Sequence, residues 1–516
     1  ARADGQRSYT AGPWVPAWSR AAYRDAFGRV KDALAAGNTY QCNLTTMMES
    51  PFSGDTGELY HDLIHAQRGH YGAYLDLGRH VIASASPELF FEWSGSKLRT
   101  RPMKGTVPRG RTTAEDARQR ARLLGSPKER AENVIIVDLL RNDLSRVAGT
   151  GTVAVTALLT PERYETVWQL TSEVTAATGP GIGLAGVFRA LFPCGSVTGA
   201  PKISTMGLIK DLEARARGVY CGAIGVVAPR TARYRARFSV AIRTAHVDRG
   251  SGRAQYGAGS GLTWSSDPDS EYDEIQAKAA ILHRRTADFQ LLETMLYIPG
   301  EGIRNLGRHL TRLADSAGYF GFPLSAGDAR RRVLAAADGA DRSRIRLLLS
   351  RDGGIAVERS APPRAPGRDV RLAVDLDPID SGQPWFFHKT TRREPYAVRA
   401  ARHPGADDVV IVNEHGHVTE TTVATIAARL GGLWITPPTS DGCLPGVERA
   451  RLIETGLLRE RTLRPADLHA ATGIALVSSL RGWRSAALSP PATVRAATKA
   501  RRPGPDPAGY LVAGHE

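Results

Sequence analysis

At 516 residues the chain is too long for one ordinary domain, and 42% hydrophobic with 23% charged residues excludes a disordered chain. The net charge is +16, but the arginines are scattered and no zinc-finger or aromatic RNA-binding pattern accompanies them, so nucleic-acid binding is not expected. The four cysteines are far apart and form no metal or redox motif, which indicates a reducing compartment. No apolar run could span a membrane and no signal pattern opens the chain, so a cytoplasmic protein is expected. Ala1 in place of a methionine leaves open whether residues precede it.

Helices and strands are expected to alternate along the first half of the chain. A helix is expected at 20–36, strands at 71–76, 80–85 and 88–93, a helix at 128–147 and another regular element at 160–178. Residues 195–199 are typical of a loop that opens a helix. Three apolar strands of an antiparallel sheet are expected between Tyr220 and Tyr256, followed by a glycine-rich loop at 257–261 and a helix at 269–285.

A second unit is expected to start with a strand at Phe289, after an arginine-rich boundary at 283–286. Its pattern combines helices at 305–320, 325–338 and 446–457 with strands at 344–350, 371–375, 408–413, 433–436 and 474–478. Residues 490–516 are rich in Pro, Ala, Arg and Gly, which predicts a flexible tail. The predicted fold class is therefore α/β (α+β), with domains at 1–286 and 287–489 and a tail at 490–516.

Lysine is scarce in this chain. Only nine of the 68 basic residues are lysine, and Lys389 is the only one between residues 279 and 498. An arginine stays protonated, whereas a lysine amine can be deprotonated and attack carbon. Distinctive local sequences make Lys104, Lys202, Lys278 and Lys389 candidates for function. The others are interpreted as incidental, namely Lys31, Lys97, Lys128, Lys210 and Lys499.

The helix expected at 269–285 carries a candidate metal site. Its Glu271, Glu274 and Lys278 share one face, and the simplest interpretation of the last two is a surface ion pair. The nearby glycine-rich segment can offer N–H groups to an anion, and a second acidic helix carries Glu129 and Glu132. Carboxylates from two helices with few other ligand types form the hard oxygen site that Mg²⁺ prefers.

Short segments spread over the first half carry a family resemblance. They are Tyr-Gln-Cys-Asn-Leu at 40–44, Ser-Pro-Glu at 86–88, Arg-Pro-Met-Lys-Gly-Thr at 101–106, Ala-Glu-Asn at 131–133, Ile-Val-Asp-Leu-Leu-Arg-Asn-Asp at 136–143, Gly-Ser-Val-Thr-Gly-Ala-Pro-Lys at 195–202, Tyr-Cys-Gly-Ala-Ile-Gly at 220–225, Ala-Ile-Arg-Thr at 241–244 and 257–278. On these segments, residues 20–285 resemble the chorismate-using enzymes, which include anthranilate synthase component I, isochorismate and salicylate synthases and aminodeoxychorismate synthase component I. The resemblance implies a β-sheet sandwich with surrounding helices.

The resemblance also implies roles for individual residues. Glu132 and Glu274 would hold Mg²⁺ on the ring carboxylate, with Glu271 nearby through water. The substrate carboxylates would be bound by Thr198, Tyr220, Arg243, Gly257, Gly259 and Lys278. Glu88 would be the general acid that protonates the departing C4 hydroxyl, because hydroxide is a poor leaving group.

Lys104 distinguishes members of the family. Aminodeoxychorismate synthases carry lysine at this place, whose amine attacks ring C2, whereas anthranilate synthases carry alanine. Two features depart from the family pattern. Gln169 stands where members often carry histidine, and little precedes Tyr23, so the tryptophan-binding or regulatory subdomain of the family is not expected.

A second candidate site surrounds Lys389, which ends the apolar run Trp-Phe-Phe-His at 385–388. Burial there would depress the pKa of its amine and favour imine chemistry with an aldehyde cofactor. Glu420 is a candidate partner for a pyridinium nitrogen, although a solvated acid at a strand end is the simpler interpretation. Leu-Pro-Gly-Val at 444–447 opens a helix whose free N–H groups could bind phosphate.

Residues 287–489 resemble the fold-type IV pyridoxal-phosphate enzymes, which include branched-chain and D-amino-acid aminotransferases and aminodeoxychorismate lyase. The segments that carry this resemblance are 291–294, 309–316, 388–391, 413–420 and 478–483. It implies that pyridoxal 5'-phosphate is linked to Lys389, with its ring nitrogen facing Glu420. It also implies that the cofactor's phosphate is held by Arg312, Gly446, Val447 and Ser479. Glu448 and Ala424 depart from the aminotransferase pattern, which disfavours a transaminase.

The two resemblances together imply a fused enzyme. The first half would convert chorismate and ammonia to 4-amino-4-deoxychorismate, and the second would release pyruvate to give 4-aminobenzoate, a folate precursor. Ammonia is expected from a separate glutamine amidotransferase subunit or free ammonium, and a homodimer is expected through the second domain. The open alternatives are an aminodeoxychorismate synthase for antibiotic biosynthesis with an inactive or aminotransferase-like second domain, and an anthranilate synthase component I. Lys104 and Glu88 disfavour a purely regulatory chorismate-binding protein.

Overall fold

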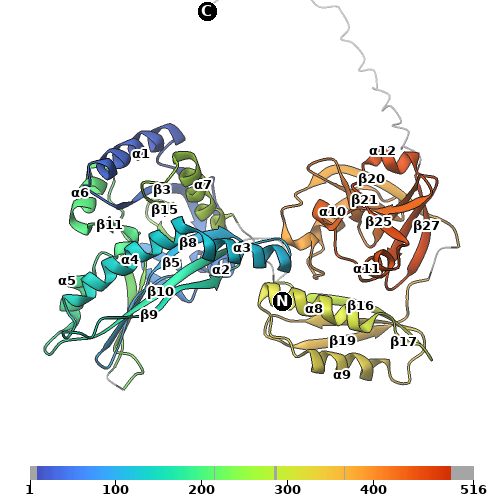
Figure 1. Cartoon of the computed structure of the whole chain (residues 1–516), viewed down its shortest axis with the longest axis horizontal. Helices are drawn as coiled ribbons and strands as arrows, with labels where there is room; N and C mark the ends of the chain where they lie inside the picture. The colour runs from blue at the N-terminus through green and yellow to red at the C-terminus, as the bar shows by residue number, and fades with distance from the viewer. Residues whose placement is uncertain (1–7, 214, 230, 284–287, 365–366, 490–516) are drawn as a thin grey trace, which may run out of the picture.

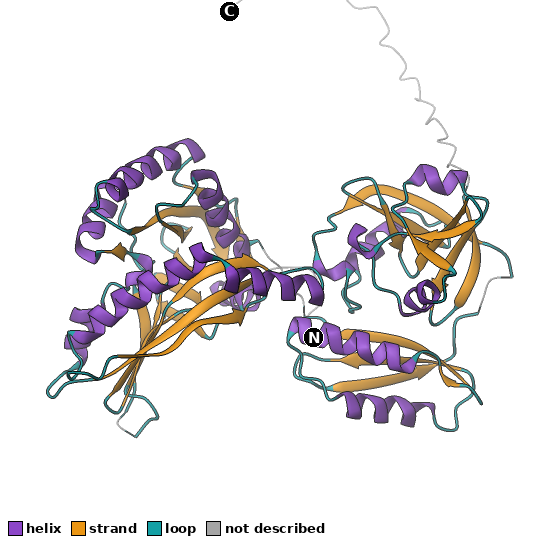
Figure 2. Cartoon of the chain, viewed as in Figure 1, coloured by secondary structure: helices purple, strands orange, loops and turns teal. Residues whose placement is uncertain are grey.

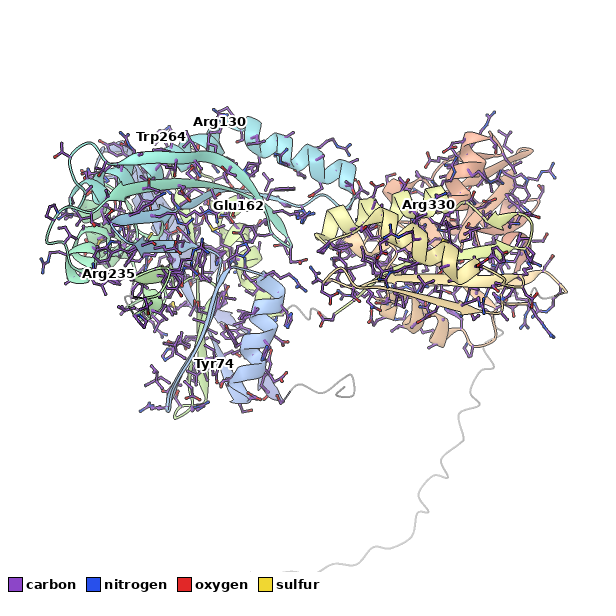
Figure 3. All side chains as sticks on the ribbon, turned by 90° about the horizontal axis from the view of Figure 1, so that it is seen from below. Tyr74, Arg130, Glu162, Arg235, Trp264 and Arg330 are labelled. Carbon is purple, nitrogen blue, oxygen red and sulfur yellow. The ribbon has the colours of Figure 1, made fainter. Side chains whose placement is uncertain are left out.

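The computed structural model describes residues 8–213, 215–229, 231–283, 288–364 and 367–489. These residues form two bodies, one from each half of the chain, with α3 (Thr113–Gly125) lying between them (Figure 1). Both bodies combine helices with sheets (Figure 2). Figure 3 shows the same arrangement from below, with Tyr74 and Arg235 on the first body and Arg330 on the second. The domain boundary predicted at 286 and the tail predicted at 490–516 fall outside the described residues.

Two antiparallel sheets build the first body. The order in one sheet is β1-β3-β15-β14-β5-β4, with β2 and β11 also paired to β3, and the order in the other is β12-β13-β6-β7-β10-β8, with β9 paired to β10. The strands are β1 (Tyr9–Ala11), β2 (Val15–Pro16), β3 (Gln41–Gly54), β4 (Tyr71–Leu77), β5 (His80–Ser86), β6 (Leu89–Ser94), β7 (Lys97–Arg101), β8 (Met103–Pro108), β9 (Ala154–Arg163), β10 (Val167–Ala177), β11 (Gly199–Ala200), β12 (Ala223–Val227), β13 (Ala236–Val240), β14 (Thr244–Asp248) and β15 (Arg253–Leu262).

The helices of the first body cover these sheets with apolar stripes. On α1 (Arg20–Ala35), Tyr23, Phe27 and Val30 recur at helical spacing and are buried, and the Ser19 side chain caps the first turn. The remaining helices are α2 (Thr56–Gln67), α4 (Pro127–Ser145), α5 (Leu184–Leu191), α6 (Lys202–Leu212) and α7 (Pro268–Ala279), with 3₁₀ turns η1 (Gly195–Val197) and η2 (Ala280–Leu282). The predicted helices at 20–36 and 128–147 are therefore confirmed by α1 and α4.

The glycine-rich segment at 257–261 is a strand and not the predicted loop. It belongs to β15, which pairs with β3 from Arg253 opposite Pro51 to Leu262 opposite Cys42. The prediction was wrong because glycine disfavours strands locally, whereas the ladder with β3 continues through all five of these residues. The region between Tyr220 and Tyr256 also differs from expectation, since β12 and β13 belong to one sheet while β14 and the start of β15 belong to the other.

The second body has two lobes. The small lobe is the sheet β17-β16-β18-β19 with α8 (Leu306–Phe320) and α9 (Ala326–Ala337), and the large lobe is the sheet β22-β21-β20-β27-β26-β23-β24-β25 with α10 (Glu394–Arg402), α11 (Val447–Glu454) and α12 (Pro465–Ala470). The strands are β16 (Leu291–Ile298), β17 (Gly302–Ile303), β18 (Ser343–Leu349), β19 (Ile355–Ser360), β20 (Val370–Ile379), β21 (Asp408–Asn413), β22 (Val418–Thr421), β23 (Thr425–Leu430), β24 (Leu433–Thr436), β25 (Leu458–Glu460), β26 (Ile474–Ser478) and β27 (Gly482–Leu488). The 3₁₀ turns are η3 (Pro384–Phe386) and η4 (Thr439–Asp441).

The predicted α/β class is confirmed in both bodies. Parallel pairs such as β20 with β21 and β20 with β27 occur beside antiparallel pairs in the large lobe. All four cysteines are buried free thiols. In the part of the chain that the structure describes, no helix is both long and apolar enough to cross a membrane.

Candidate functional sites

A cavity of about 370 Å³ opens in the first body where β8, β15, α4 and α7 meet. Its lining includes all but one of the predicted site residues of this body, namely Glu88, Lys104, Glu132, Tyr220, Arg243, Gly257, Gly259, Glu271, Glu274 and Lys278. Thr198 is the exception, since it is buried outside the lining and its hydroxyl donates to the Cys194 carbonyl at 3.0 Å. The structure thus brings together residues that lie far apart in the sequence.

The glycines of β15 shape one wall of this cavity. A Cβ atom at Gly257 would lie 2.2 Å from the ring of Tyr220, and one at Gly261 would lie 2.5 Å from Nζ of Lys104. Real Cβ atoms do not approach other atoms so closely, because repulsion rises steeply below van der Waals contact. Glycine at these two positions therefore lets Tyr220 and Lys104 pack directly against the strand.

Glu88 is buried just before β6 and faces the cavity. Burial raises the pKa of its carboxyl to about 7, against the opposing effects of a hydrogen bond from Ser196 and the charge of Lys104. The Ser196 hydroxyl donates to Oε1 of Glu88 at 2.7 Å. A carboxyl with this pKa keeps its proton in a large fraction of molecules near neutral pH, as a general acid must. No separate role is expected for Ser196 from the sequence, although it lies in the recognised segment at 195–202.

Carboxylates from α4 and α7 meet on another side of the cavity, each close to a lysine. Nζ of Lys128 lies 3.9 Å from Glu132 and 3.6 Å from Glu271. Nζ of Lys278 lies 2.5 Å from Glu274, and also donates to the Gly259 carbonyl. Lys128 was interpreted as incidental from the sequence, yet it lines the cavity and pairs with two predicted metal ligands. Its approach to Glu271 depends on how α4 and α7 are placed around the cavity, which no local pattern encodes.

The chemistry of these carboxylates fits a divalent cation. Burial raises the pKa of Glu132 to about 7, because several acids share a poorly solvated space. Burial also opposes ionisation of Glu274, but the charge of Lys278 outweighs it and lowers the pKa. Among the described residues no three His, Cys, Asp or Glu side chains are gathered as a ready ligand set. Oxygen donors of this kind suit Mg²⁺ once the lysines move aside.

The second predicted site lies between the two lobes of the second body. Lys389 follows η3, and its carbonyl accepts a hydrogen bond from the Leu292 backbone at 2.9 Å. The Lys389 side chain is half-buried, and desolvation of its amine, together with the charge of Arg312, lowers its pKa to about 8. An appreciable fraction of the amine is therefore neutral near physiological pH, as imine formation requires.

Glu420 lies on β22 and is buried rather than solvated. Burial raises its pKa to about 7, although a hydrogen bond from the Tyr396 hydroxyl, 2.8 Å from Oε1, lowers it in part. A buried acid without a cation bonded to it suits a heteroaromatic nitrogen that carries a proton. Tyr396 on α10 was not identified from the sequence, and no motif marks it.

Arg312 is fixed by a buried carboxylate. Its Nε and Nη2 atoms lie 2.8 and 2.7 Å from the oxygens of Glu293 on β16, and its Nη1 donates to the Pro445 carbonyl. Burial opposes ionisation of Glu293, but Arg312 and His309 lower its pKa to about 2. His309 Nε2 in turn lies 2.8 Å from the Ser479 hydroxyl. One hydrogen-bond network thereby holds two of the predicted phosphate contacts, Arg312 and Ser479, together with Pro445, which directly precedes a third, Gly446.

Helix α11 begins at Val447, directly after Gly446. The backbone N–H groups of its first turn have no carbonyl partner within the helix, so they can bind phosphate. Glu448 in the same turn accepts hydrogen bonds from Asn305 at 2.9 Å and from Arg451 at 2.7 Å.

Glu293 was not assigned a role from the sequence, although a single acid inside the apolar strand at 291–298 is the signal of a paired buried charge.

Comparisons with known proteins follow this division of the chain. The family of chorismate binding enzymes matches residues 3–284, and the amino-transferase class IV family matches residues 290–488. The chain belongs to the chorismate binding enzyme family, and carries in addition a class IV aminotransferase domain. Both families are families of enzymes.

Curated relatives cover the first half. Aminodeoxychorismate synthase component 1 of Escherichia coli is 36% identical over 261 residues, which are 51% of this chain and 56% of the relative. Anthranilate synthase component 1 of Streptomyces coelicolor is 39% identical over 268 residues, which are 52% of this chain and 51% of the relative. The chain thus spans about half the length of these relatives. A crystal structure of anthranilate synthase component I from Streptococcus pneumoniae is 30% identical with a TM-score of 0.48, and covers 53% of this chain and 60% of that one.

The packing of Tyr220 against β15 yields a first prediction. Gly257→Ala should lower the free energy of unfolding by about 1–3 kcal/mol, because the added methyl group overlaps the Tyr220 ring. Urea denaturation measures this difference. Gly207→Ala is the matched control, since this glycine of α6 has open space around it, and alanine there should be neutral or stabilise by about 0.5–1 kcal/mol. Equal effects of the two substitutions would contradict the packing argument.

The environment of Lys389 yields a second prediction. The rate at which the amine reacts with pyridoxal 5'-phosphate should rise with pH and level off above about pH 8, because only the neutral amine attacks the aldehyde. Borohydride trapping followed by mass spectrometry of the Lys389 peptide measures this rate. Lys389→Arg should give no trapped product, and a midpoint near the ordinary lysine value would show that the amine is solvated.

Proposed function

We propose that this chain is an aminodeoxychorismate synthase fused to an aminodeoxychorismate lyase, with the synthase at residues 1–286 and the lyase at 287–489. The observation that carries the proposal is the presence of a lysine amine and an acid of raised pKa in one cavity, with a second lysine of lowered pKa in the other body. The first pair is Lys104 and Glu88, and the second lysine is Lys389.

Lys104 and Glu88 divide the first reaction between them. The Lys104 amine attacks ring C2 of chorismate, the double bond shifts, and the C4–O bond breaks. Glu88 donates its proton to the departing C4 hydroxyl, which leaves as water. Ammonia then attacks C4, the double bond shifts back, and the bond between C2 and the Lys104 nitrogen breaks. The enzyme is thereby returned to its starting state.

Glu132 and Glu274 would hold Mg²⁺ in this cavity, with Glu271 nearby. The cation would neutralise a carboxylate of the substrate and orient the ring. Tyr220, Arg243 and Lys278 would bind the other carboxylate, and the backbone of Gly257 and Gly259 would contact the substrate along β15. Thr198 would act indirectly, because its carbonyl accepts a hydrogen bond from the backbone of Asn43 on β3, which lines the cavity.

In the second body, the residues around Lys389 would hold pyridoxal 5'-phosphate, whose ring would supply an electron sink for the substrate. Glu420 would keep a proton on the ring nitrogen, a task for which burial beside Tyr396 suits it. Arg312, Ser479 and the amides of Gly446 and Val447 would bind the phosphate. The Lys389 amine would be the base that moves a proton as pyruvate departs and the ring becomes aromatic.

The wider role that we propose is synthesis of 4-aminobenzoate for folate, with ammonia from a separate glutamine amidotransferase and a homodimer formed through the second domain. An antibiotic pathway with an aminotransferase-like second domain is the rival, and Glu448 disfavours it because its carboxylate is committed to Asn305 and Arg451. Anthranilate synthesis is a further rival, because relatives of that name match the first half as well. The presence of Lys104 disfavours it.

One incubation tests the proposed function. The protein is mixed with chorismate, ammonium, Mg²⁺ and pyridoxal 5'-phosphate, and the products are separated and detected by fluorescence. We expect 4-aminobenzoate and pyruvate in equal amounts. Anthranilate as the product would refute the role of Lys104, and lasting accumulation of 4-amino-4-deoxychorismate would refute a working lyase.

Substitution of the two lysines should separate the half-reactions. Lys104→Arg should abolish consumption of chorismate and leave conversion of supplied 4-amino-4-deoxychorismate intact, because arginine keeps the charge but cannot act as the nucleophile. Lys389→Arg should do the reverse. Each variant is the control for the other, and loss of both half-reactions in either one would contradict this division.

The raised pKa of Glu88 predicts a pH dependence of the first half-reaction. The acid acts in its protonated form, so the rate should be highest below about pH 7 and fall as pH rises through that value. Glu88→Gln should remove this limb and lower the rate by about 10²–10⁴-fold, the usual contribution of a general acid. Ser196→Ala removes a hydrogen bond that favours the ionised form, so it should move the limb to higher pH.

A further inference from the structure

The segment between β8 and α3 belongs to the first body and contacts the second body through hydrogen bonds. We call residues 109–111 the junction segment. Arg109 Nη2 donates to the carbonyl of Tyr319 at 2.9 Å, and its guanidinium lies 4.4 Å from the centre of the Tyr319 ring. The Tyr319 hydroxyl donates to the Gly110 carbonyl at 2.7 Å. Each body therefore supplies both a donor and an acceptor to this contact, which lies where α3 meets α8 in Figure 1.

The junction segment is held rigidly by the first body. The Arg109 side chain is only 6% exposed, and its Nε atom lies 2.6 Å from Asp116 on α3. Its Nη1 atom donates to the Tyr164 carbonyl at 2.9 Å, and the indole of Trp168 donates to the same Asp116 oxygen. A buried arginine with this many fixed partners has little freedom to follow movements of the second body.

Arg111 extends the contact across both lobes. Its Nη1 atom lies 3.3 Å from the carbonyls of Ser381 and Ser440, which belong to the large lobe, whereas Tyr319 belongs to α8 of the small lobe. A paired carboxylate, Glu115, holds the guanidinium in place at 2.8 Å. The junction segment thus bridges the two lobes that enclose Lys389.

The same segment orients the residue before Lys389. His388 Nε2 lies 3.2 Å from the Arg111 carbonyl, and Nδ1 lies 3.0 Å from the Ser316 hydroxyl. A carbonyl can only accept, so Nε2 carries the proton and Nδ1 accepts from Ser316. Burial lowers the pKa of His388 to about 4, so this neutral tautomer persists at physiological pH. The imidazole also stacks on Tyr319, with ring centres 4.3 Å apart.

We propose that the junction segment is a positioning element for the second site: it fixes both lobes and His388 so that the Lys389 amine stays shielded from water. The inference rests on the proposed imine-forming role of Lys389. The synthase body would thereby act on the chemistry of the second body without touching its substrate.

The charges with the largest effect on Lys389 among the described residues belong to the second body. They are Arg312 on α8, Glu293 on β16, Arg393 before α10 and Glu420 on β22. Weakening the junction segment leaves these charges in place, so its effect must come through desolvation, which is the largest cause of the lowered pKa. Entry of water would move the pKa of Lys389 up toward the ordinary lysine value of about 10.4.

Two variants of the full-length protein break the contact from opposite sides. Arg111→Ala removes the bridge to Ser381 and Ser440, and Tyr319→Phe removes the hydroxyl bonded to Gly110 while keeping the ring. Each cofactor-free variant is mixed with pyridoxal 5'-phosphate over a range of pH, trapped with borohydride and quantified at the Lys389 peptide. We expect the midpoint to rise by about one pH unit, and trapping at pH 7 to fall about tenfold, since one unit removes nine-tenths of the neutral amine. Arg111→Lys should restore part of the loss.

Arg346→Ala is the control, because this arginine of the small lobe pairs from β18 to β19, with Glu358 at 3.1 Å, and makes no hydrogen bond or ion pair with the junction segment among the described residues. It should leave the midpoint unchanged. Unchanged midpoints in folded Arg111→Ala and Tyr319→Phe would overturn the inference while leaving the proposed function standing. Absence of trapping in the unaltered protein would refute the role of Lys389 and this inference with it. Should Arg111→Ala not fold, Tyr319→Phe decides, since it loses a single hydroxyl.

Discussion

Removal of a few charged groups from water is the constraint on which both sites depend. Burial raises the pKa of Glu88 and of Glu420 to about 7, and lowers that of Lys389 to about 8. Desolvation disfavours whichever form is charged, so acids and amines converge on neutrality from opposite sides. The surrounding packing maintains this state, because a buried charge without a partner is costly and each group has a nearby hydroxyl or counter-charge.

The fold could be predicted best where one element carries its own signal. The periodic stripe of α1 and the long pattern of α4 gave their bounds within a residue or two, because such helices bury one face regardless of distant partners. The strand at 257–261 could not be predicted in this way. Its glycines favour a loop locally, and only pairing with β3 and the close approach of Tyr220 make it a strand.

The residues of the candidate sites also divide into those with a local sequence signal and those that depend on tertiary packing. Residues on recognised segments, such as Glu88 and Lys104, were identified from the sequence and line one cavity. Two partners of predicted site residues were not identified from the sequence, namely Ser196, which bonds to Glu88, and Lys128, which pairs with Glu271. Each of these contacts forms only through the packing of separate elements. A local pattern states which side chains a segment offers, whereas the packing of the elements decides which of them meet.

Two of the three lysines that line the first cavity show how geometry separates roles that composition alone leaves equal. Lys278 is committed to the Glu274 carboxylate and the Gly259 carbonyl, so its amine is held by two partners. Lys104 instead lies against Gly261, where the missing side chain leaves its amine at the cavity wall. An arginine could supply the charge of Lys278, but it could not replace the amine of Lys104 or Lys389 as a nucleophile, because guanidinium stays protonated. Lysine at these two positions is therefore not interchangeable with the arginine that supplies most of the basic charge of this chain, and the junction segment leads from the strand that carries Lys104 to the lobes around Lys389.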